Sequence, residues 1–237
     1  MRRIKKINEH LYYLPYRKKG DRPNLYYIKG SNYAIAVDAG NSYDHISNFY
    51  KQLEINNLPL PKYTIISHWH WDHTFALPYC KSKTICTKLT NDKLKEVKTW
   101  KWNKASMKQR EKDGLDISFC NKNIEIEYPN LSDIKVVTCD IEIVDKMVLD
   151  LGDIKVELIP HMATHSDDSL FVYIPSEALF VQDADWINPY ISNEYDQEKL
   201  KDMINFFDSL DYKYHYLGHV NFETKEDALS ELRKNLL

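Results

Sequence analysis

The sequence predicts an α/β sandwich, in which strands and helices come in blocks and do not alternate regularly as βαβ units. Three observations support this fold class. Short aliphatic and aromatic runs fill the first 40 residues, a second strand-rich stretch begins near residue 135, and segments with helical spacing lie between and after these blocks. A chain of 237 residues, 43% of them apolar, can bury a sizeable core.

The first part of the chain is expected to form strands and one helix. Strands are predicted at residues 11–14, 25–28, 33–37 and 63–66, where Ile, Val, Leu and Tyr dominate. Between the third and fourth strands, Ile46, Phe49, Tyr50 and Leu53 repeat with a period close to 3.6 residues. That spacing predicts a helix over residues 43–53.

Residues 90–113 predict a basic helical insertion, because lysine and arginine outnumber acidic residues and no clean apolar stripe is present. Trp100 and Trp102 lie in this segment. Two interpretations remain open here: a lid with a basic rim, or a solvated helix with two packed indoles. Neither a linker rich in proline and glycine nor a repeat is present, so we expect one domain over residues 1–237.

The second part of the chain is expected to supply more strands and two helices. Strands are predicted at 135–138, 146–151, 154–159, 170–174, 178–181 and 214–217. Asp196 is a suitable N-cap for a helix with Leu200, Met203, Ile204 and Phe207 on one face. Thr224 is a second N-cap, for a final helix that reaches Leu236.

Composition excludes several classes of protein. The net charge of −3 gives no support for a nucleic-acid partner, and no apolar run approaches the roughly 20 residues that a membrane-spanning helix needs. The four cysteines show no CxxC pattern, and we find no signal-peptide core. We therefore expect a cytoplasmic protein with a small-molecule substrate and no membrane partner, and leave a homo-oligomer open.

The histidines at the end of the 63–66 strand carry the strongest functional signal. In an extended segment, His68 and His70 project to one side, and the indoles of Trp69 and Trp71 project to the other. A carboxylate and a third imidazole, Asp72 and His73, follow where the chain turns away. Four ligand-type side chains within six residues are typical of a site for a borderline metal such as zinc.

The pattern His68-x-His70-x-Asp72-His73 after an apolar strand resembles the main motif of the metallo-β-lactamase superfamily. Other motifs of that family follow in the same order along nearly the whole chain. They are matched by Asp38 in Val-Asp-Ala-Gly, His165 before a serine-containing turn, Asp183 at the end of a strand, and His219 in Leu-Gly-His. Five motifs in the correct order are much more specific than any one of them.

The resemblance implies a four-layer αβ/βα sandwich of two mixed sheets, with two divalent metal ions at one edge. Zinc is the expected metal, with manganese or iron as alternatives. In the family's pattern, one ion is bound by His68, His70 and His165, and the other by Asp72, His73 and His219, with Asp183 as a bridge. Asp72 would also orient the hydroxide nucleophile, and Asp38 would hold the histidine loop by hydrogen bonds.

Several positions depart from the family's pattern. The third motif lacks its usual Pro-Gly turns, which makes His161 a rival of His165 as the ligand. Gln182 stands where the family normally has glycine, and Asp185 is a weaker rival of Asp183 for the bridge. Asp167 and Asp168 either cap backbone amides or face the pocket. Tyr190 and Tyr195 are weak candidates for oxyanion donors.

The resemblance implies a binuclear hydrolase that uses a metal-bridging hydroxide on a small ester, lactone, thioester or phosphodiester, with an anionic substrate as one option. Two other hypotheses remain. The first is an iron-dependent oxidoreductase, similar to the family's sulfur dioxygenases, which uses the same ligands. The second is a metal-binding scaffold without catalysis. Because the family supports many reactions, the fold alone does not select the substrate.

Overall fold

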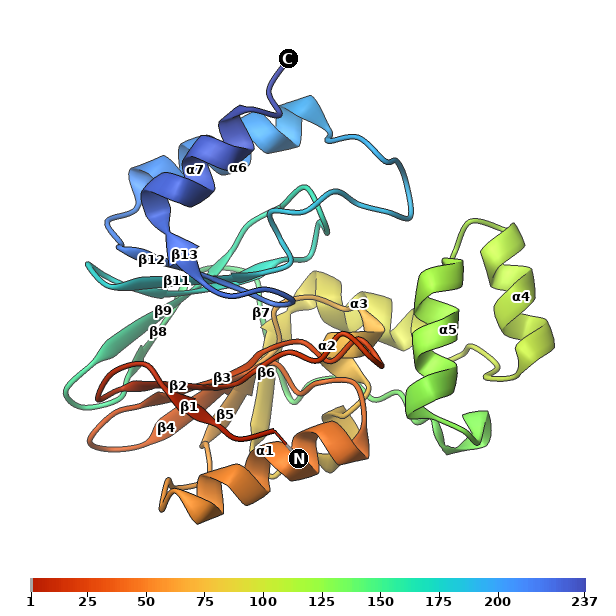
Figure 1. Cartoon of the computed structure of the whole chain (residues 1–237), viewed down its shortest axis with the longest axis horizontal. Helices are drawn as coiled ribbons and strands as arrows, with labels where there is room; N and C mark the ends of the chain where they lie inside the picture. Colours follow the sequence, from red (N-terminus) through yellow and green to blue (C-terminus); the bar gives the residue numbers. More distant parts are fainter. Residues whose placement is uncertain (1) are drawn as a thin grey trace.

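The chain, described over residues 2–237 by a computed structural model, forms two β-sheets that pack face to face (Figure 1). The seven strands of the first sheet follow the chain order: β1 (Lys5–Lys6), β2 (Leu11–Leu14), β3 (Leu25–Lys29), β4 (Ala34–Val37), β5 (Tyr63–Ile65), β6 (Lys83–Thr87) and β7 (Ile141–Ile143). The six strands of the second sheet lie in the order β13 (Glu223–Thr224), β12 (Tyr214–Leu217), β11 (Ala178–Gln182), β10 (Leu170–Ile174), β9 (Lys155–Pro160) and β8 (Met147–Asp150).

The strands β2 to β4 are apolar on both faces because they contact two different cores. Side chains alternate along a strand, so Tyr26 and Ile28 face the interior between the sheets, whereas Leu25 and Tyr27 face outward. In the interior, the ring of Tyr26 lies 5.1 Å from that of Phe180 on β11. This aromatic contact joins the two sheets. Because both faces of β2 to β4 are buried, these strands read as continuous apolar runs.

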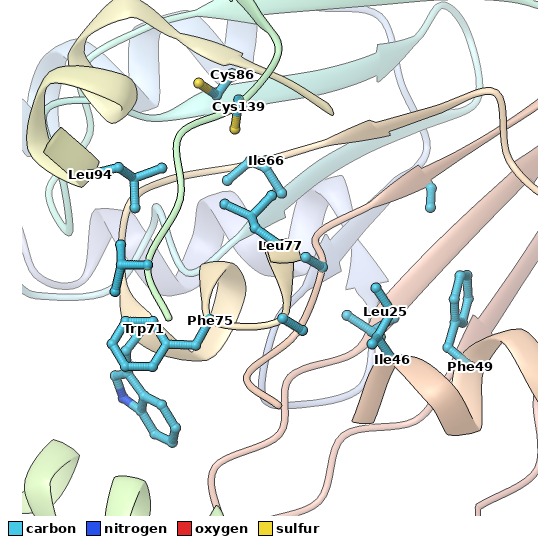
Figure 2. Close-up of a cluster of buried hydrophobic side chains, with 14 of the residues drawn as sticks. Leu25, Ile46, Phe49, Ile66, Trp71, Phe75, Leu77, Cys86, Leu94 and Cys139 are labelled. Carbon is cyan, nitrogen blue, oxygen red and sulfur yellow. The ribbon is translucent and has the colours of Figure 1, made fainter. Parts of the chain in front are cut away.

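Helices cover the outer face of each sheet. α1 (Tyr43–Ile55) packs Ile46 and Phe49 against the first sheet, and Figure 2 shows these side chains beside Leu25 of β3. α6 (Gln197–Ser209) and α7 (Lys225–Arg233) cover the second sheet (Figure 1). The molecule is therefore a four-layer αβ/βα sandwich, as the family resemblance implies.

Both predicted N-caps of these last helices are confirmed. The Asp196 carboxylate accepts hydrogen bonds from the backbone N–H groups of Glu198 and Lys199, and Thr224 Oγ1 accepts one from Asp227. α6 buries Leu200, Met203, Ile204 and Phe207, the face that the spacing predicted. The last helix ends at Arg233, and so does not reach Leu236.

The predicted strand at 135–138 is wrong. This segment is an irregular loop that leads into β7. Side chains bind its backbone at the far end, where Cys139 N donates to Asn91 Oδ1 at 2.7 Å and Asp140 N donates to Thr84 Oγ1 at 3.0 Å. Ile134 and Val136 of this loop are buried. The alternation of apolar residues therefore indicated burial, but the segment forms no strand hydrogen bonds.

Several short elements were not anticipated from the sequence. They are β1, β6, β7, β13, the helix α5 (Ser118–Glu127) and the 3₁₀ turns Leu77–Tyr79 and Leu131–Asp133. The basic segment at 90–113 is not one helix. It forms the C-terminal part of α3 (Lys88–Val97) and all of α4 (Lys104–Lys112), and α4 and α5 stand beside the sandwich in Figure 1. No helix within residues 2–237 has the length and apolar character to cross a membrane.

The link between α3 and α4 is held by an aromatic cluster around Arg110. The Arg110 guanidinium lies 4.6 Å from the ring centroids of both Trp100 and Trp102, and Arg110 Nη1 donates to the carbonyl of Lys101 at 3.0 Å. Trp102 in turn packs edge-to-face on Phe75, 5.0 Å away. The two indoles therefore pack behind the histidine loop, which favours the packing interpretation over the lid.

Replacing Arg110 is expected to loosen this cluster. Because a desolvated cation over an aromatic ring contributes about 2 kcal/mol, Arg110→Ala should lower the free energy of unfolding by about 1–3 kcal/mol. Chemical denaturation measures this change. Lys108→Ala, on the exposed side of the same helix, is the matched control and should leave stability within about 0.5 kcal/mol. Equal stability of the two variants would contradict a stabilising role of Arg110 in the aromatic cluster.

Candidate metal centre

The predicted site residues meet at one edge of the two sheets. Asp38 directly follows β4, His68 and His70 follow β5, Asp183 follows β11, and His219 follows β12. β4 and β5 are parallel, as are β11 and β12, so the ends of each pair lie at the same edge. His165 comes from the loop before β10, which is antiparallel to β11 and therefore begins at that edge too. Residues far apart in sequence thus share one location.

The first group consists of three imidazoles. His68, His70 and His165 each offer one ring nitrogen, and these nitrogens lie within 4.8 Å of one another. His70 Nδ1 is 3.0 Å from His68 Nε2 and 2.9 Å from His165 Nε2. All three residues are buried.

The outer nitrogens of this group determine where the protons lie. His165 Nδ1 is 2.8 Å from the carbonyl oxygen of Ile187, which only accepts, so this nitrogen carries the hydrogen. Ser67 Oγ donates to the Asp38 carboxylate and therefore accepts from His68 Nδ1, 3.0 Å away. In the neutral rings, both Nε2 atoms then direct lone pairs toward His70 Nδ1, which can donate to only one of them.

The charge state of the group fits a metal ion. Burial lowers the pKa of His68 and His70 well below the usual value, and the neighbouring histidines lower it further. The rings of His68 and His70 are thus neutral, the form in which histidine binds metals. A cation at the centre of the three rings would satisfy lone pairs that otherwise oppose one another.

The second group combines two carboxylates with two imidazoles. Ligand atoms of Asp72, His73, Asp183 and His219 lie within 4.8 Å of one another. His73 Nε2 is 2.9 Å from Asp72 Oδ2 and 3.0 Å from Asp183 Oδ2, and His219 Nε2 is 3.0 Å and 3.2 Å from the same two oxygens. Asp72 and His73 belong to the short helix α2 (Trp71–Thr74), at the predicted turn of the chain.

Protonated imidazoles balance the carboxylates of this group when no metal is bound. Burial lowers the pKa of His73, but the charges of Asp72, Asp38 and Asp183 outweigh burial and raise it well above the usual value. For His219, burial is likewise outweighed by Asp183 and Asp72, and the pKa rises. Protons and metal ions compete for such nitrogens. The donor set therefore fits a divalent cation.

Asp38 connects the histidine loop to both sheets. Its Oδ1 accepts from Ser67 N at 2.8 Å, and its Oδ2 accepts from Ser67 Oγ at 3.0 Å, His73 Nδ1 at 2.6 Å and Gln182 Nε2 at 2.5 Å. Gln182 has φ of 57°, the left-handed region that glycine adopts readily. Gln182 thus adopts a conformation that favours glycine, and its side chain supplies a donor to Asp38.

The structure separates the rival residues from the two groups. His161 stacks on Phe206 with ring centroids 4.1 Å apart, and its Nδ1 lies 2.7 Å from the Met162 carbonyl oxygen. His165, and not His161, is therefore the histidine in the first group. Asp185 Oδ2 lies 3.2 Å from His215 Nε2 in a separate buried pair, so Asp185 is not part of the second group.

The remaining candidates from the sequence, two aspartates and two tyrosines, make contacts outside the two groups of ligand atoms. Asp168 is buried and accepts from Thr90 Oγ1 at 2.7 Å, which ties the third-motif loop to α3, whereas Asp167 is exposed and pairs with Lys199. The Tyr190 ring lies 5.0 Å from that of His70, but its hydroxyl points to Cys120 Sγ, 3.2 Å away. Tyr195 OH donates to the Asp185 carbonyl. Neither tyrosine hydroxyl therefore faces the metal groups.

Asp21 contacts the site and was missed from the sequence. Its Oδ1 lies 3.3 Å from His219 Nδ1, on the side of the ring away from the second group. Burial, followed by the charge of Asp72, raises the pKa of Asp21 to about 7. In the sequence, Gly20-Asp21 reads as an ordinary turn between two strands, and no motif marks it.

Removing the Asp38 carboxylate should disrupt the hydrogen bonds that hold the histidine loop. Asp38→Ala leaves four buried donors without an acceptor, so we expect the free energy of unfolding to fall by about 3–5 kcal/mol. Asp38→Asn keeps the shape and the tolerance for the observed φ of 64°, and should retain part of that stability. Chemical denaturation of both variants checks this. A loss below about 1 kcal/mol in Asp38→Ala would contradict it.

Comparisons with known proteins agree with this geometry. No functionally curated protein matches the sequence. Among solved structures, a metallo-beta-lactamase from Pontibacter korlensis is similar with a TM-score of 0.67 and 13% identity, covering 98% of this chain and 99% of that one. A metallo-beta-lactamase family protein from Thermus thermophilus has a TM-score of 0.66 and 17% identity, with 97% and 80% covered.

An archaeal metallo-beta-lactamase superfamily protein from Sulfolobus tokodaii is similar with a TM-score of 0.58 and 18% identity, over 96% of this chain and 86% of that one. At these identities the likeness shows the fold alone. The family model described as the metallo-beta-lactamase superfamily matches residues 19–219, a range that includes both groups of ligand atoms. The match, the four-layer sandwich and the two donor groups together place this chain in the metallo-beta-lactamase superfamily.

Proposed function

We propose that the chain is a binuclear metal-dependent hydrolase that acts on a small ester, lactone, thioester or phosphodiester. The observation that carries this proposal is the presence of two adjacent groups of ligand atoms. His68 and His73 belong to different groups, yet their ring centroids are only 4.3 Å apart. Such closeness supports two cations that act on one substrate, rather than two independent structural sites.

In this proposal, His68, His70 and His165 hold one cation, and Asp72, His73 and His219 hold the other. Three neutral imidazoles are a typical zinc site, so zinc is the expected metal, with manganese or iron as alternatives. Asp183 is the proposed bridge. Its Oδ2 faces His73 and His219, while its buried Oδ1 has no hydrogen-bond partner in the structure, so the carboxylate has binding capacity left for a cation.

The two cations, when bound, would lower the pKa of a water molecule to give a nucleophile and would polarise the bond to be cleaved. The protein's own residues hold the ligands in place. Asp38 and the Ile187 carbonyl accept the Nδ1 protons of His73 and His165, which fixes the orientation of these rings. We assign Asp72 the role of orienting the attacking water, because it is the motif carboxylate that does not bridge.

The accessible side of the site lies at His219, whose side chain is 16% exposed, the largest value in the second group. The Trp186 ring centroid is 6.4 Å from that of His219, and Trp186 is 42% exposed. Its backbone is held by Thr164 Oγ1, which donates to the Trp186 carbonyl at 2.8 Å. An exposed indole on an anchored backbone supports a substrate with an apolar or aromatic group, while the charge of the substrate stays a prediction.

His70→Ala should remove a central ligand of the first group. We expect metal content to fall below two ions per chain, and hydrolysis to fall by more than about 100-fold, because even loss of a ligand's hydrogen-bond partner costs 10–100-fold. Elemental analysis measures the metal, and a panel of lactones, thioesters and phosphodiesters measures turnover. His161→Ala, outside both groups, is the control and should retain both properties.

Two full metal equivalents in His70→Ala would refute the ligand assignment. Iron in the wild-type protein, together with oxygen consumption, would instead support the oxidoreductase hypothesis. A fully metal-loaded protein that hydrolyses none of the lactones, thioesters and phosphodiesters would support the hypothesis of a metal-binding scaffold without catalysis.

Asp21→Asn tests whether the carboxylate orients His219. Because the partner of a ligating histidine fixes its ring, the variant should bind its second cation about 10–100-fold more weakly. Competition between the protein and a zinc chelator measures this affinity. Asp145→Asn removes an exposed carboxylate elsewhere and should have no effect. Equal zinc affinity of the wild type and Asp21→Asn would exclude the orienting role.

A further inference from the structure

A basic cavity lies on the side of α1 that faces the β2–β3 loop. Its volume is about 540 Å³, within the usual range for small-molecule sites. The lining residues come from the N-terminus, the β2–β3 loop and the first turns of α1, and they include four basic side chains: Arg2, Arg17, Arg22 and Lys51. None of the residues that line the cavity belongs to the two metal groups.

The charges in this cavity do not cancel. Asp44 is the one acidic residue of the lining. Arg17 and Arg22 share the buried carboxylate of Glu127, with Nη2 of each arginine 2.6 Å from a carboxylate oxygen. Within residues 2–237, Arg2 and Lys51 form no salt bridge. About two positive charges therefore remain after both acidic groups are counted.

Unpaired polar atoms of two lining residues are buried beneath the surface of the cavity. His45 is only 2% exposed, and neither of its ring nitrogens has a hydrogen-bond partner in the structure. Gly40 covers the Nδ1 edge, since a Cβ at Gly40 would lie 2.5 Å from that nitrogen. Arg17 Nε is also buried without a partner. Each unpaired buried donor costs about 1–3 kcal/mol of stability.

We propose that this cavity binds a phosphate-bearing small molecule of the diphosphate type. A surplus of two positive charges matches an anion with at least two negative charges, and guanidinium groups match phosphate oxygens in geometry. The volume exceeds that of a single phosphate group, so a larger phosphate ester fits better. This site does not rest on the proposed hydrolase activity.

Inorganic pyrophosphate is the probe, titrated by calorimetry into the metal-loaded full-length protein at low and moderate salt. We expect saturable binding that weakens with salt and falls at least about ten-fold in the double variant Arg2→Ala/Lys51→Ala. The control Lys135→Ala/Lys155→Ala removes two exposed charges elsewhere and should bind as the wild type does. Asp44→Asn removes the opposing charge of the lining and should bind several-fold more tightly.

Equal affinity in the wild type and Arg2→Ala/Lys51→Ala would overturn the proposal, since pyrophosphate would then bind elsewhere, for example at the metals. An equal loss in both double variants would also overturn it, because it would reflect net charge alone. Tighter binding by Asp44→Asn supports the site without relying on a variant that loses function, and unchanged binding by that variant counts against it.

Discussion

The structure depends on one buried carboxylate. Asp38 accepts four hydrogen bonds, from Ser67 N, Ser67 Oγ, His73 Nδ1 and Gln182 Nε2. These donors come from the loop after β5, from α2 and from the end of β11, so the carboxylate ties the first sheet to the second. Because an anion buried without partners is strongly destabilising, the four donors and the carboxylate require one another. The same contacts fix the proton on His73 Nδ1 and turn Nε2 toward Asp72 and Asp183.

The two donor groups differ in charge, and this difference has a physical origin. In the first group burial keeps the imidazoles of His68 and His70 neutral. The second group contains two carboxylates that hold His73 and His219 protonated when no cation is bound. A pair of unequal sites next to each other suits the hydrolysis that we propose. The histidine loop is anchored in the hydrophobic core by Trp71 and Phe75, whose rings pack edge-to-face (Figure 2).

The main part of the site and of the fold could be predicted because its signals are local. His68, His70, Asp72 and His73 lie within six residues after an apolar strand, and the caps Asp196 and Thr224 mark their helices directly. His165, Asp183 and His219 came from the family resemblance, since the pairing of β11 with β12 leaves no local pattern. Asp21 and the loop at 134–139 could not be predicted, because both depend on contacts with distant residues, His219 and Asn91. The helix α5 was missed for a similar reason: it buries only a few residues, and its apolar spacing is weak.

Metal content shows more directly than any activity assay whether these residues form a two-cation site. The measurement is elemental analysis of the protein purified without added metal, and again after zinc is added and the excess removed. If each group of ligand atoms binds one cation, the loaded protein retains about two zinc or manganese ions per chain. A protein that retains no metal, or saturates at a single ion, would contradict a two-cation site.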